Sequence, residues 1–187
     1  MHSDPNRILD QYLVCAARVG DGDAWRRLVC RWQPKLLAHA WRLLGNGDRA
    51  RDAVQDAWVD IWRGLAHLED AAAFPAWAYK IVTRRTQRSF QVADRERLHI
   101  SEDQADSLTF EQGGGEHAAD LALVMAALRS LPAPQRSALA LFYLEDMSVA
   151  EVAVALDVPP GTVKTRLMHA RNKLRAKLEG ASDEQNG

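Results

Sequence analysis

The stretch from Val158 to Leu178 constrains the fold of this chain more than any other part of it. It carries six basic residues and no acidic one, whereas the whole chain has a formal net charge of −1. Its apolar residues recur every three or four positions and would form one stripe along a helix: Val163, Leu167, Ala170, Leu174 and Leu178. We therefore predict a helix that begins at a Pro-Pro-Gly turn, buries one side and offers a basic side to phosphates and base edges.

A shorter helix is predicted just before it. Ser148 and Glu151 have the spacing of a capping box, in which each side chain accepts a hydrogen bond from the other residue's backbone amide. Apolar residues then follow at helical spacing: Val149, Val152, Ala153 and Leu156. A further helix is expected upstream, from Leu131-Pro132 to about Glu145, with three residues for the core: Leu139, Phe142 and Tyr143. A short helix, a tight turn and a longer basic helix are typical of a DNA-binding helix-turn-helix.

The rest of the chain contains one basic segment and one acidic segment. With 187 residues, of which 47% are apolar and 26% charged, it is long enough for two small domains. Residues 77–92 hold four basic residues and no acidic one, whereas residues 101–120 hold six acidic residues and no basic one. The acidic part includes Gly113-Gly114-Gly115 and predicts a flexible linker.

The segment before the linker is predicted to be helical throughout, from residue 5 to about residue 93. We expect a first helix around Leu9, a second capped by Asp23, a third from about Asp48 to Leu65, and a fourth beginning near Phe74 after a loop at residues 71–73. All six tryptophans fall between residues 25 and 77, and we interpret them as core anchors. The fold class is therefore all-α.

Several function classes find no support in the sequence. The histidines are scattered, no catalytic triad or metal-ligand spacing occurs, and no glycine-rich phosphate loop is present, so we expect no enzyme, no catalytic residue, no metal and no cofactor. No apolar run approaches the length of a membrane span or a signal peptide, and we expect a cytoplasmic protein without membrane insertion. Cys15 and Cys30 are expected to be buried or half-buried thiols.

Three blocks of sequence resemble one protein family. Asp52 to Arg63 (DAVQDAWVDIWR) and Phe74 to Ile81 (FPAWAYKI) resemble region 2 of the extracytoplasmic-function sigma factors of bacterial RNA polymerase, within the sigma-70 family. Leu131 to Leu178, above all GTVKTRLMHAR, resembles region 4 of the same family. The resemblance implies region 2 at residues 1–93, an acidic linker at 94–119, region 4 at 120–180 and a disordered tail at 181–187. It implies a sigma factor that binds core polymerase and directs promoter-specific initiation, with a stress- or signal-responsive regulon expected.

The resemblance also implies which residues meet which partner. Region 4 would read the −35 element in the major groove through seven residues: Thr162, Lys164, Thr165, Arg166, His169, Arg171 and Lys173. Region 2 would hold the opening −10 element, with a flipped base near residues 67–74, through six: Phe74, Trp77, Lys80, Arg84, Arg85 and Arg88. Core polymerase would be contacted at its β′ clamp helices by three: Asp52, Gln55 and Asp56. The implied partners are core RNA polymerase (β′ clamp helices and β flap), promoter DNA and an anti-sigma factor.

The chain departs from the family pattern at several positions. Arg49 and Arg51 stand where the family often has acidic residues. Because like charges at an interface repel, we hypothesise that the chain binds core polymerase weakly, or needs a modification or a partner to bind it well. A gain in core affinity for Arg49→Asp/Arg51→Glu would support this hypothesis, and no gain would refute it. Arg84 and Arg88 stand where the family commonly has an asparagine and an aspartate. An asparagine can both donate to and accept from a base edge, whereas an arginine only donates, so the family's preferred −10 sequence cannot be assumed for this chain. His169 stands where arginine is common, and Pro160 adds a second proline at the turn.

Three alternatives compete with a sigma factor. A sigma-like mimic or anti-sigma-binding regulator would keep the fold without promoter activity, and Arg49 and Arg51 favour it slightly, although the basic helix opposes it. An ordinary helix-turn-helix repressor would be expected to dimerise on a palindrome, but no dimerisation heptad is present. An enzyme is the least favoured. A mobility-shift experiment on promoter DNA, with and without core polymerase, separates the first two from a sigma factor.

Overall fold

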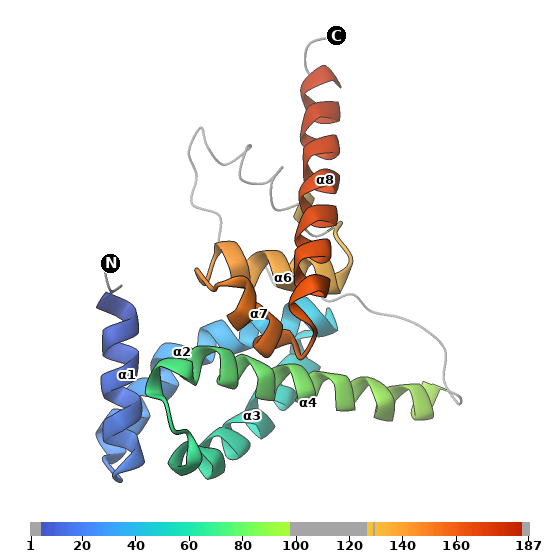
Figure 1. Ribbon diagram of the computed structural model, residues 1–187. Helices are drawn as coiled ribbons and strands as arrows, with labels where there is room; N and C mark the ends of the chain where they lie inside the picture. Colours follow the sequence, from blue (N-terminus) through green and yellow to red (C-terminus); the bar gives the residue numbers. More distant parts are fainter. Residues whose placement is uncertain (1–4, 98–126, 129, 185–187) are drawn as a thin grey trace, which may run out of the picture. The chain divides into compact units, whose positions relative to one another are not determined.

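The computed structural model describes residues 5–97, 127–128 and 130–184, and every regular element in these ranges is helical (Figure 1). The elements are α1 (Pro5–Arg18), α2 (Gly22–Leu44), α3 (Gly47–Gly64), η1 (Leu65–His67), η2 (Ala71–Ala73), α4 (Phe74–Arg97), α6 (Ala133–Tyr143), α7 (Val149–Leu156) and α8 (Pro160–Glu184). They form two compact units. The first contains α1 to α4 together with Val154–Asp157, and the second contains α6, the start of α7, and α8. The all-α fold class is confirmed.

The helices of the first unit begin and end at residues suited to capping. Asp21 precedes α2, and its Oδ1 accepts hydrogen bonds from the amides of Asp23 (2.9 Å) and Ala24 (3.0 Å), so the cap lies two residues before the expected one. Gly45 ends α2 in the left-handed conformation, with φ of 68°. Asn46 caps α3, its Oδ1 accepting from the amide of Arg49 at 2.9 Å.

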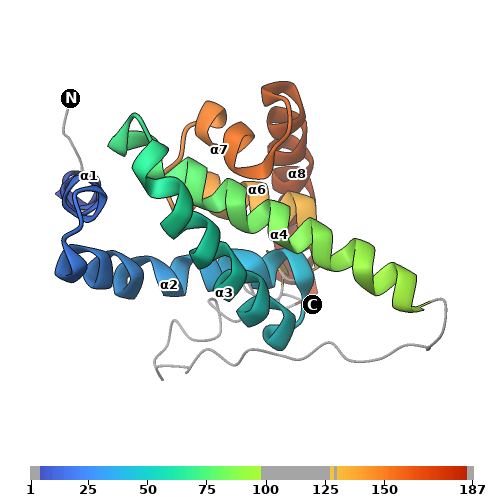
Figure 2. The same ribbon diagram turned by 90° about the horizontal axis from the view of Figure 1, so that it is seen from below.

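The core of the first unit lies where α2, α3 and α4 pack against one another, with α1 against α2 (Figure 2). Trp32 is 2% exposed and meets Phe74 and Tyr79 edge-on, with ring centroids 5.2 and 5.7 Å apart. Edge-to-face contacts of this kind add to the free energy of apolar burial. Trp62, by contrast, is 53% exposed, so the interpretation of all six tryptophans as core anchors is wrong for this one.

The second unit contains the predicted capping box. The amide of Ser148 donates to Glu151 Oε2 at 2.7 Å, and the amide of Glu151 donates to Ser148 Oγ at 3.2 Å. Helix α8 packs on α6 and buries the predicted stripe at Val163, Leu167 and Ala170. The expectation for α6 was wrong in one respect: the helix ends at Tyr143, whose side chain is 53% exposed instead of lying in the core.

Some predicted boundaries and burial states differ from the structure. Residues 71–73, expected as a loop, form the 3₁₀-helix η2, because Asp70 caps it by accepting from the amide of Ala72 at 2.8 Å. Helix α4 continues to Arg97, so residues 94–97 of the expected linker are helical, and the rest of the linker lies outside the described residues. Helix α8 reaches Glu184, so the first part of the expected disordered tail is helical. Cys15 and Cys30 are exposed, contrary to expectation. None of the helices, over the described ranges, is long and apolar enough to cross a membrane.

Candidate nucleic-acid interface

Helix α8 presents a basic surface on the side away from its buried stripe. Pro160 opens the helix, where its fixed φ and missing amide proton cost nothing, and the first two basic residues, Lys164 and Arg166, follow within two turns. Five of the seven residues predicted to meet the −35 element are exposed: Lys164, Thr165, His169, Arg171 and Lys173. Because the apolar and basic sides are separated around one helix, α8 can rest on α6 and still meet a polyanion.

The other predicted residues of α8 are less accessible. Thr162 and Arg166 are half-buried, and partial burial lowers the pKa of the Arg166 guanidinium from its usual value. Two exposed side chains also bond to the backbone of their own helix: Thr165 Oγ1 donates to the Gly161 oxygen at 3.0 Å, and Arg171 Nε donates to the Leu167 oxygen at 3.3 Å. Lys164, His169 and Lys173 are therefore the residues of this group most available to DNA.

The cations of α4 do not form the single basic face that the sequence suggested. Lys80, Arg84 and Arg88 follow one another at intervals of four and share one side of the helix. Arg85 lies to one side of them and turns toward α3. Its Nη2 lies 2.5 Å from Asp60 Oδ2 and its Nη1 lies 3.6 Å from Asp56 Oδ2. The hydrogen bond from Arg85 to Asp60 raises the pKa of Arg85, so this guanidinium stays charged and paired.

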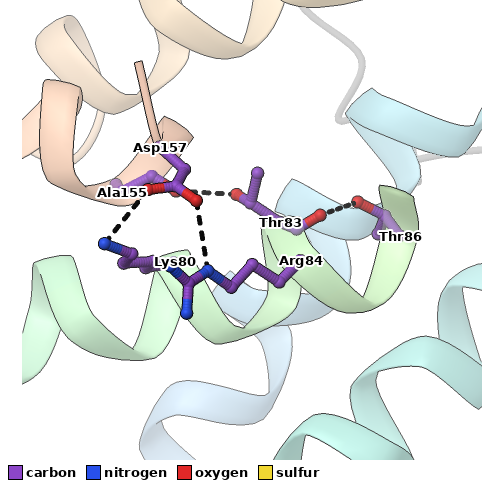
Figure 3. A network of polar contacts seen from close by, with 6 residues as sticks. All are labelled: Lys80, Thr83, Arg84, Thr86, Ala155 and Asp157. Carbon is purple, nitrogen blue, oxygen red and sulfur yellow. Dashed lines mark hydrogen bonds and ion pairs between the residues drawn. The ribbon is translucent and has the colours of Figure 1, made fainter. Parts of the chain in front are cut away.

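Two of the remaining cations bind a carboxylate of the same compact unit (Figure 3). Lys80 Nζ lies 3.0 Å from Asp157 Oδ1, and Arg84 Nε lies 3.1 Å from Asp157 Oδ2. The hydrogen bond from Lys80, followed by that from Arg84, lowers the pKa of Asp157, which therefore remains ionised at neutral pH. Nothing in the local sequence pattern of α4 indicated this partner, 73 residues beyond Arg84.

A buried chain of hydrogen bonds lies beside this ion pair. The Thr83 hydroxyl donates to the Ala155 backbone oxygen at 2.7 Å (Figure 3). Its oxygen is therefore available to accept from His39 Nε2, which lies 3.0 Å away. His39 is fully buried, and burial, with a smaller contribution from the charge of Arg42, lowers its pKa to about 3. A neutral ring with its proton on Nε2 satisfies both bonds. Sequence reasoning missed His39 and Thr83, because a lone histidine and a lone threonine at helical spacing indicate no contact.

The two aromatic residues of the predicted −10 site, Phe74 and Trp77, differ in how far they are buried. Phe74 is 0% exposed and packs within the core, which leaves its ring no surface to offer a base, and this part of the prediction does not fit the structure. Trp77 is half-buried and lies against Gly64, where an added Cβ would come within 2.8 Å of the indole Cζ2. The absence of a side chain at Gly64 therefore allows this ring to pack close to the end of α3.

The outer side of α3 carries the three residues predicted to meet core polymerase. Asp52, Gln55 and Asp56 are all exposed, opposite the buried residues Val54 and Ile61. Arg51, one of the two unusual arginines, is exposed and pairs with Asp48 one turn earlier. This local pair partly neutralises the charge that was expected to repel a basic partner.

No group of three or more metal-ligating side chains occurs in the ranges 5–97, 127–128 and 130–184. The interface consists instead of exposed cations, an exposed carboxylate face and one half-buried indole. Such groups can bind phosphates, stack on bases and meet a basic protein surface.

Comparison with known proteins gives the two halves of the chain separate matches. Residues 28–96 match the family described as Sigma-70 region 2, and residues 121–174 match Sigma-70, region 4. The ECF RNA polymerase sigma-E factor of Escherichia coli K12 is 31% identical over 185 residues, which cover 92% of this chain and 96% of that protein. The RNA polymerase sigma-H factor of Pseudomonas aeruginosa PAO1 is 29% identical, covering 91% of this chain and 94% of that protein.

Two solved structures are also similar. The sigma factor RpoE in complex with the anti-sigma factor NepR from Bartonella quintana superposes with a TM-score of 0.69 and 26% identity, over 83% of this chain and 96% of that one. The structure of CnrH with the cytosolic domain of CnrY gives a TM-score of 0.62 at 24% identity, over 92% of this chain and 98% of that one, and supports the fold alone.

Proposed function

This chain belongs to the extracytoplasmic-function sigma factors of the sigma-70 family, and from that membership we propose how its surfaces divide the work of promoter recognition. It is a promoter-directing sigma factor that binds core RNA polymerase. Sigma factors are initiation factors and not enzymes, and the proposal assigns no catalysis to the chain. We further propose that it acts in the cytoplasm, on a stress- or signal-responsive set of promoters.

The first part of the proposal assigns α8 to the −35 element. The separation of its buried stripe from its exposed basic side is the observation that carries this assignment. Lys164 and His169 lie in the first turns, where a recognition helix meets base edges, and Lys173 lies further along, where it would hold the phosphate backbone. Thr162 and Arg166 are half-buried, and we assign them, together with Thr165 and Arg171, to the periphery of the contact with the −35 element.

The second part assigns α4 and the turn before it to the −10 element. Lys80, Arg84 and Arg88 lie on one side of α4 and would follow the backbone of an opened strand, while the half-buried indole of Trp77 would border the unstacked base. Arg85 is assigned a supporting role, because Asp60 and Asp56 already hold its guanidinium. The domain limits at residues 93, 119 and 180 belong to this proposal as well.

The third part assigns the outer side of α3 to core polymerase. Asp52, Gln55 and Asp56 are exposed, and two of them are acidic, which suits basic residues on the β′ clamp helices. We propose that region 4 meets the β flap. The similarity to a sigma factor solved with an anti-sigma factor supports an anti-sigma partner for this chain too.

Transcription in vitro tests the whole proposal. Core RNA polymerase supplemented with this chain should start transcripts on DNA from upstream of its own gene, and core polymerase alone should not. A mimic without promoter activity would bind core polymerase and produce no transcript. A repressor would shift the same DNA without core polymerase.

A further inference from the structure

The way Asp157 binds two cations of α4 indicates what kind of anion these cations could bind in its place. Lys80 and Arg84 are four residues apart on α4, and each binds a different oxygen of the Asp157 carboxylate (Figure 3). A DNA phosphodiester also offers two anionic oxygens from one small group. We infer that Lys80 and Arg84 form a site for one phosphate of the single strand, and that Asp157 occupies this site in the free protein as a competing anion. The inference rests on the proposed function of α4.

The backbone at Asp157 has a conformation that a glycine would also suit. Asp157 has φ of 54°, in the left-handed region that favours glycine. It follows the last turn of α7, where its amide donates to Val154 O at 3.2 Å and the amide of Val158 donates to Ala153 O at 3.0 Å. Glycine is the common residue in this type of helix ending. A charged side chain stands here instead, and its charge lies between two cations.

A neighbouring hydrogen bond holds this segment on α4. The Thr83 hydroxyl donates to Ala155 O at 2.7 Å, and Thr83 lies between Lys80 and Arg84 in the sequence. This bond is buried, whereas the side chains of Lys80, Arg84 and Asp157 are 29%, 56% and 36% exposed. The ion pairs are thus open to solvent and can exchange Asp157 for another anion, although the segment is anchored beside them.

The expected strength of this competition is modest. Each exposed ion pair changes an equilibrium by at most about fivefold, and two pairs that share one carboxylate are not additive, so the pairs of Asp157 with Lys80 and Arg84 should weaken strand binding about two- to tenfold together. A competitor of that size does not prevent binding to a promoter strand. It discourages binding to single-stranded nucleic acid in general, where no other contact helps to displace Asp157.

Fluorescence anisotropy with the full chain and a labelled oligothymidylate of about twelve nucleotides tests the inference, because a phosphate contact needs no base sequence. Asp157→Asn should bind about two- to tenfold more tightly than the wild type at low salt. Asp157→Gly should gain as much, since glycine suits the left-handed backbone. Asp146→Asn is the matched control: Asp146 also has positive φ, 50°, and the variant removes the same charge elsewhere.

The possible outcomes distinguish a failure of the inference about Asp157 from a failure of the proposed function of α4. Equal affinities for Asp157→Asn and Asp146→Asn would overturn the inference. A gain that persists in Asp157→Asn/Lys80→Gln/Arg84→Gln would overturn it too, because the gain would not come from these cations. If Lys80→Gln/Arg84→Gln in the wild-type background binds the oligonucleotide as well as the wild type does, the assignment of α4 to the single strand fails. If it binds more weakly while Asp157→Asn gains nothing, only the inference fails.

Discussion

The ring of His39 in α2 and the hydroxyl of Thr83 in α4 are joined by a buried hydrogen bond, with 3.0 Å between Nε2 and Oγ1. Thr83 in turn donates to the backbone oxygen of Ala155. One hydroxyl therefore links two helices of the first unit to the Val154–Asp157 segment of the same unit. Thr83 stands between Lys80 and Arg84 in α4, but its bonds are buried, so their removal should affect stability before it affects DNA binding.

Thr83→Val should destabilise the protein. Valine has nearly the same shape but leaves the ring N–H of His39 and the Ala155 oxygen without this partner, at a cost of about 1–3 kcal/mol in the free energy of unfolding. Urea denaturation measures the change. Thr83→Ser is the control, because it retains the hydroxyl and should keep most of the stability. Equal destabilisation in both variants would mean that the methyl group, and not the hydrogen bonds, stabilises this position.

The burial of His39 predicts that stability falls in weak acid. Its pKa is about 3 in the folded protein and about 6.5 when unfolded, so below pH 6.5 the unfolded state binds a proton that the folded state does not. The free energy of unfolding should therefore fall by about 1.4 kcal/mol per pH unit from about pH 6.5 toward pH 3 and stay level above pH 6.5.

Urea denaturation between pH 7.5 and 5 can isolate this effect, with roughly 2 kcal/mol expected from His39 over that range. His39→Gln keeps an amide donor for Thr83 but cannot titrate, so its stability should change less with pH. His67→Gln removes an exposed histidine and serves as the matched control. The assignment to His39 is contradicted if both variants follow the wild type.

Periodicity was sufficient to predict much of this fold, and its limits have a physical reason. The capping box of Ser148 and Glu151 and the buried stripe of α8 depend on residues three or four apart, whose proximity the helix itself imposes. The partners of Arg85 and Asp157 lie on other elements, and a helical repeat does not specify which helix will face which. The burial of Phe74 could not be predicted for the same reason.

Gly64→Ala should impair promoter opening while the protein still folds. The added Cβ would come within 2.8 Å of the Trp77 ring, so the indole must shift, whereas alanine is the better helix former by about 1 kcal/mol. Permanganate reactivity of promoter thymines in the presence of core polymerase measures opening, and it should fall. Gly22→Ala, where an added Cβ meets nothing within 4 Å, should leave it unchanged. Unaltered reactivity in Gly64→Ala would remove Trp77 from the −10 site.

The lysines of α8 should contribute to the salt dependence of promoter binding. Replacing Lys164 or Lys173 by glutamine should lower the slope of log affinity against log salt by about 0.9 for each phosphate that is no longer neutralised. Filter binding of the holoenzyme to a duplex promoter fragment at several salt concentrations gives the slope. Arg27→Gln removes an exposed positive charge from α2 and serves as control. A slope that changes equally in all three variants would indicate a general effect of net charge.

Run-off transcription with Lys164→Glu/Lys173→Glu tests most directly whether the basic side of α8 selects the promoter. The template is the DNA upstream of the protein's own gene, and holoenzyme formation is checked in parallel by co-elution with core polymerase. We predict that the wild-type holoenzyme produces a defined transcript and that the variant binds core polymerase normally but yields at least about tenfold less of it, because two attractions to phosphate become repulsions. A variant that transcribes as well as the wild type would contradict the assignment of α8 to the promoter.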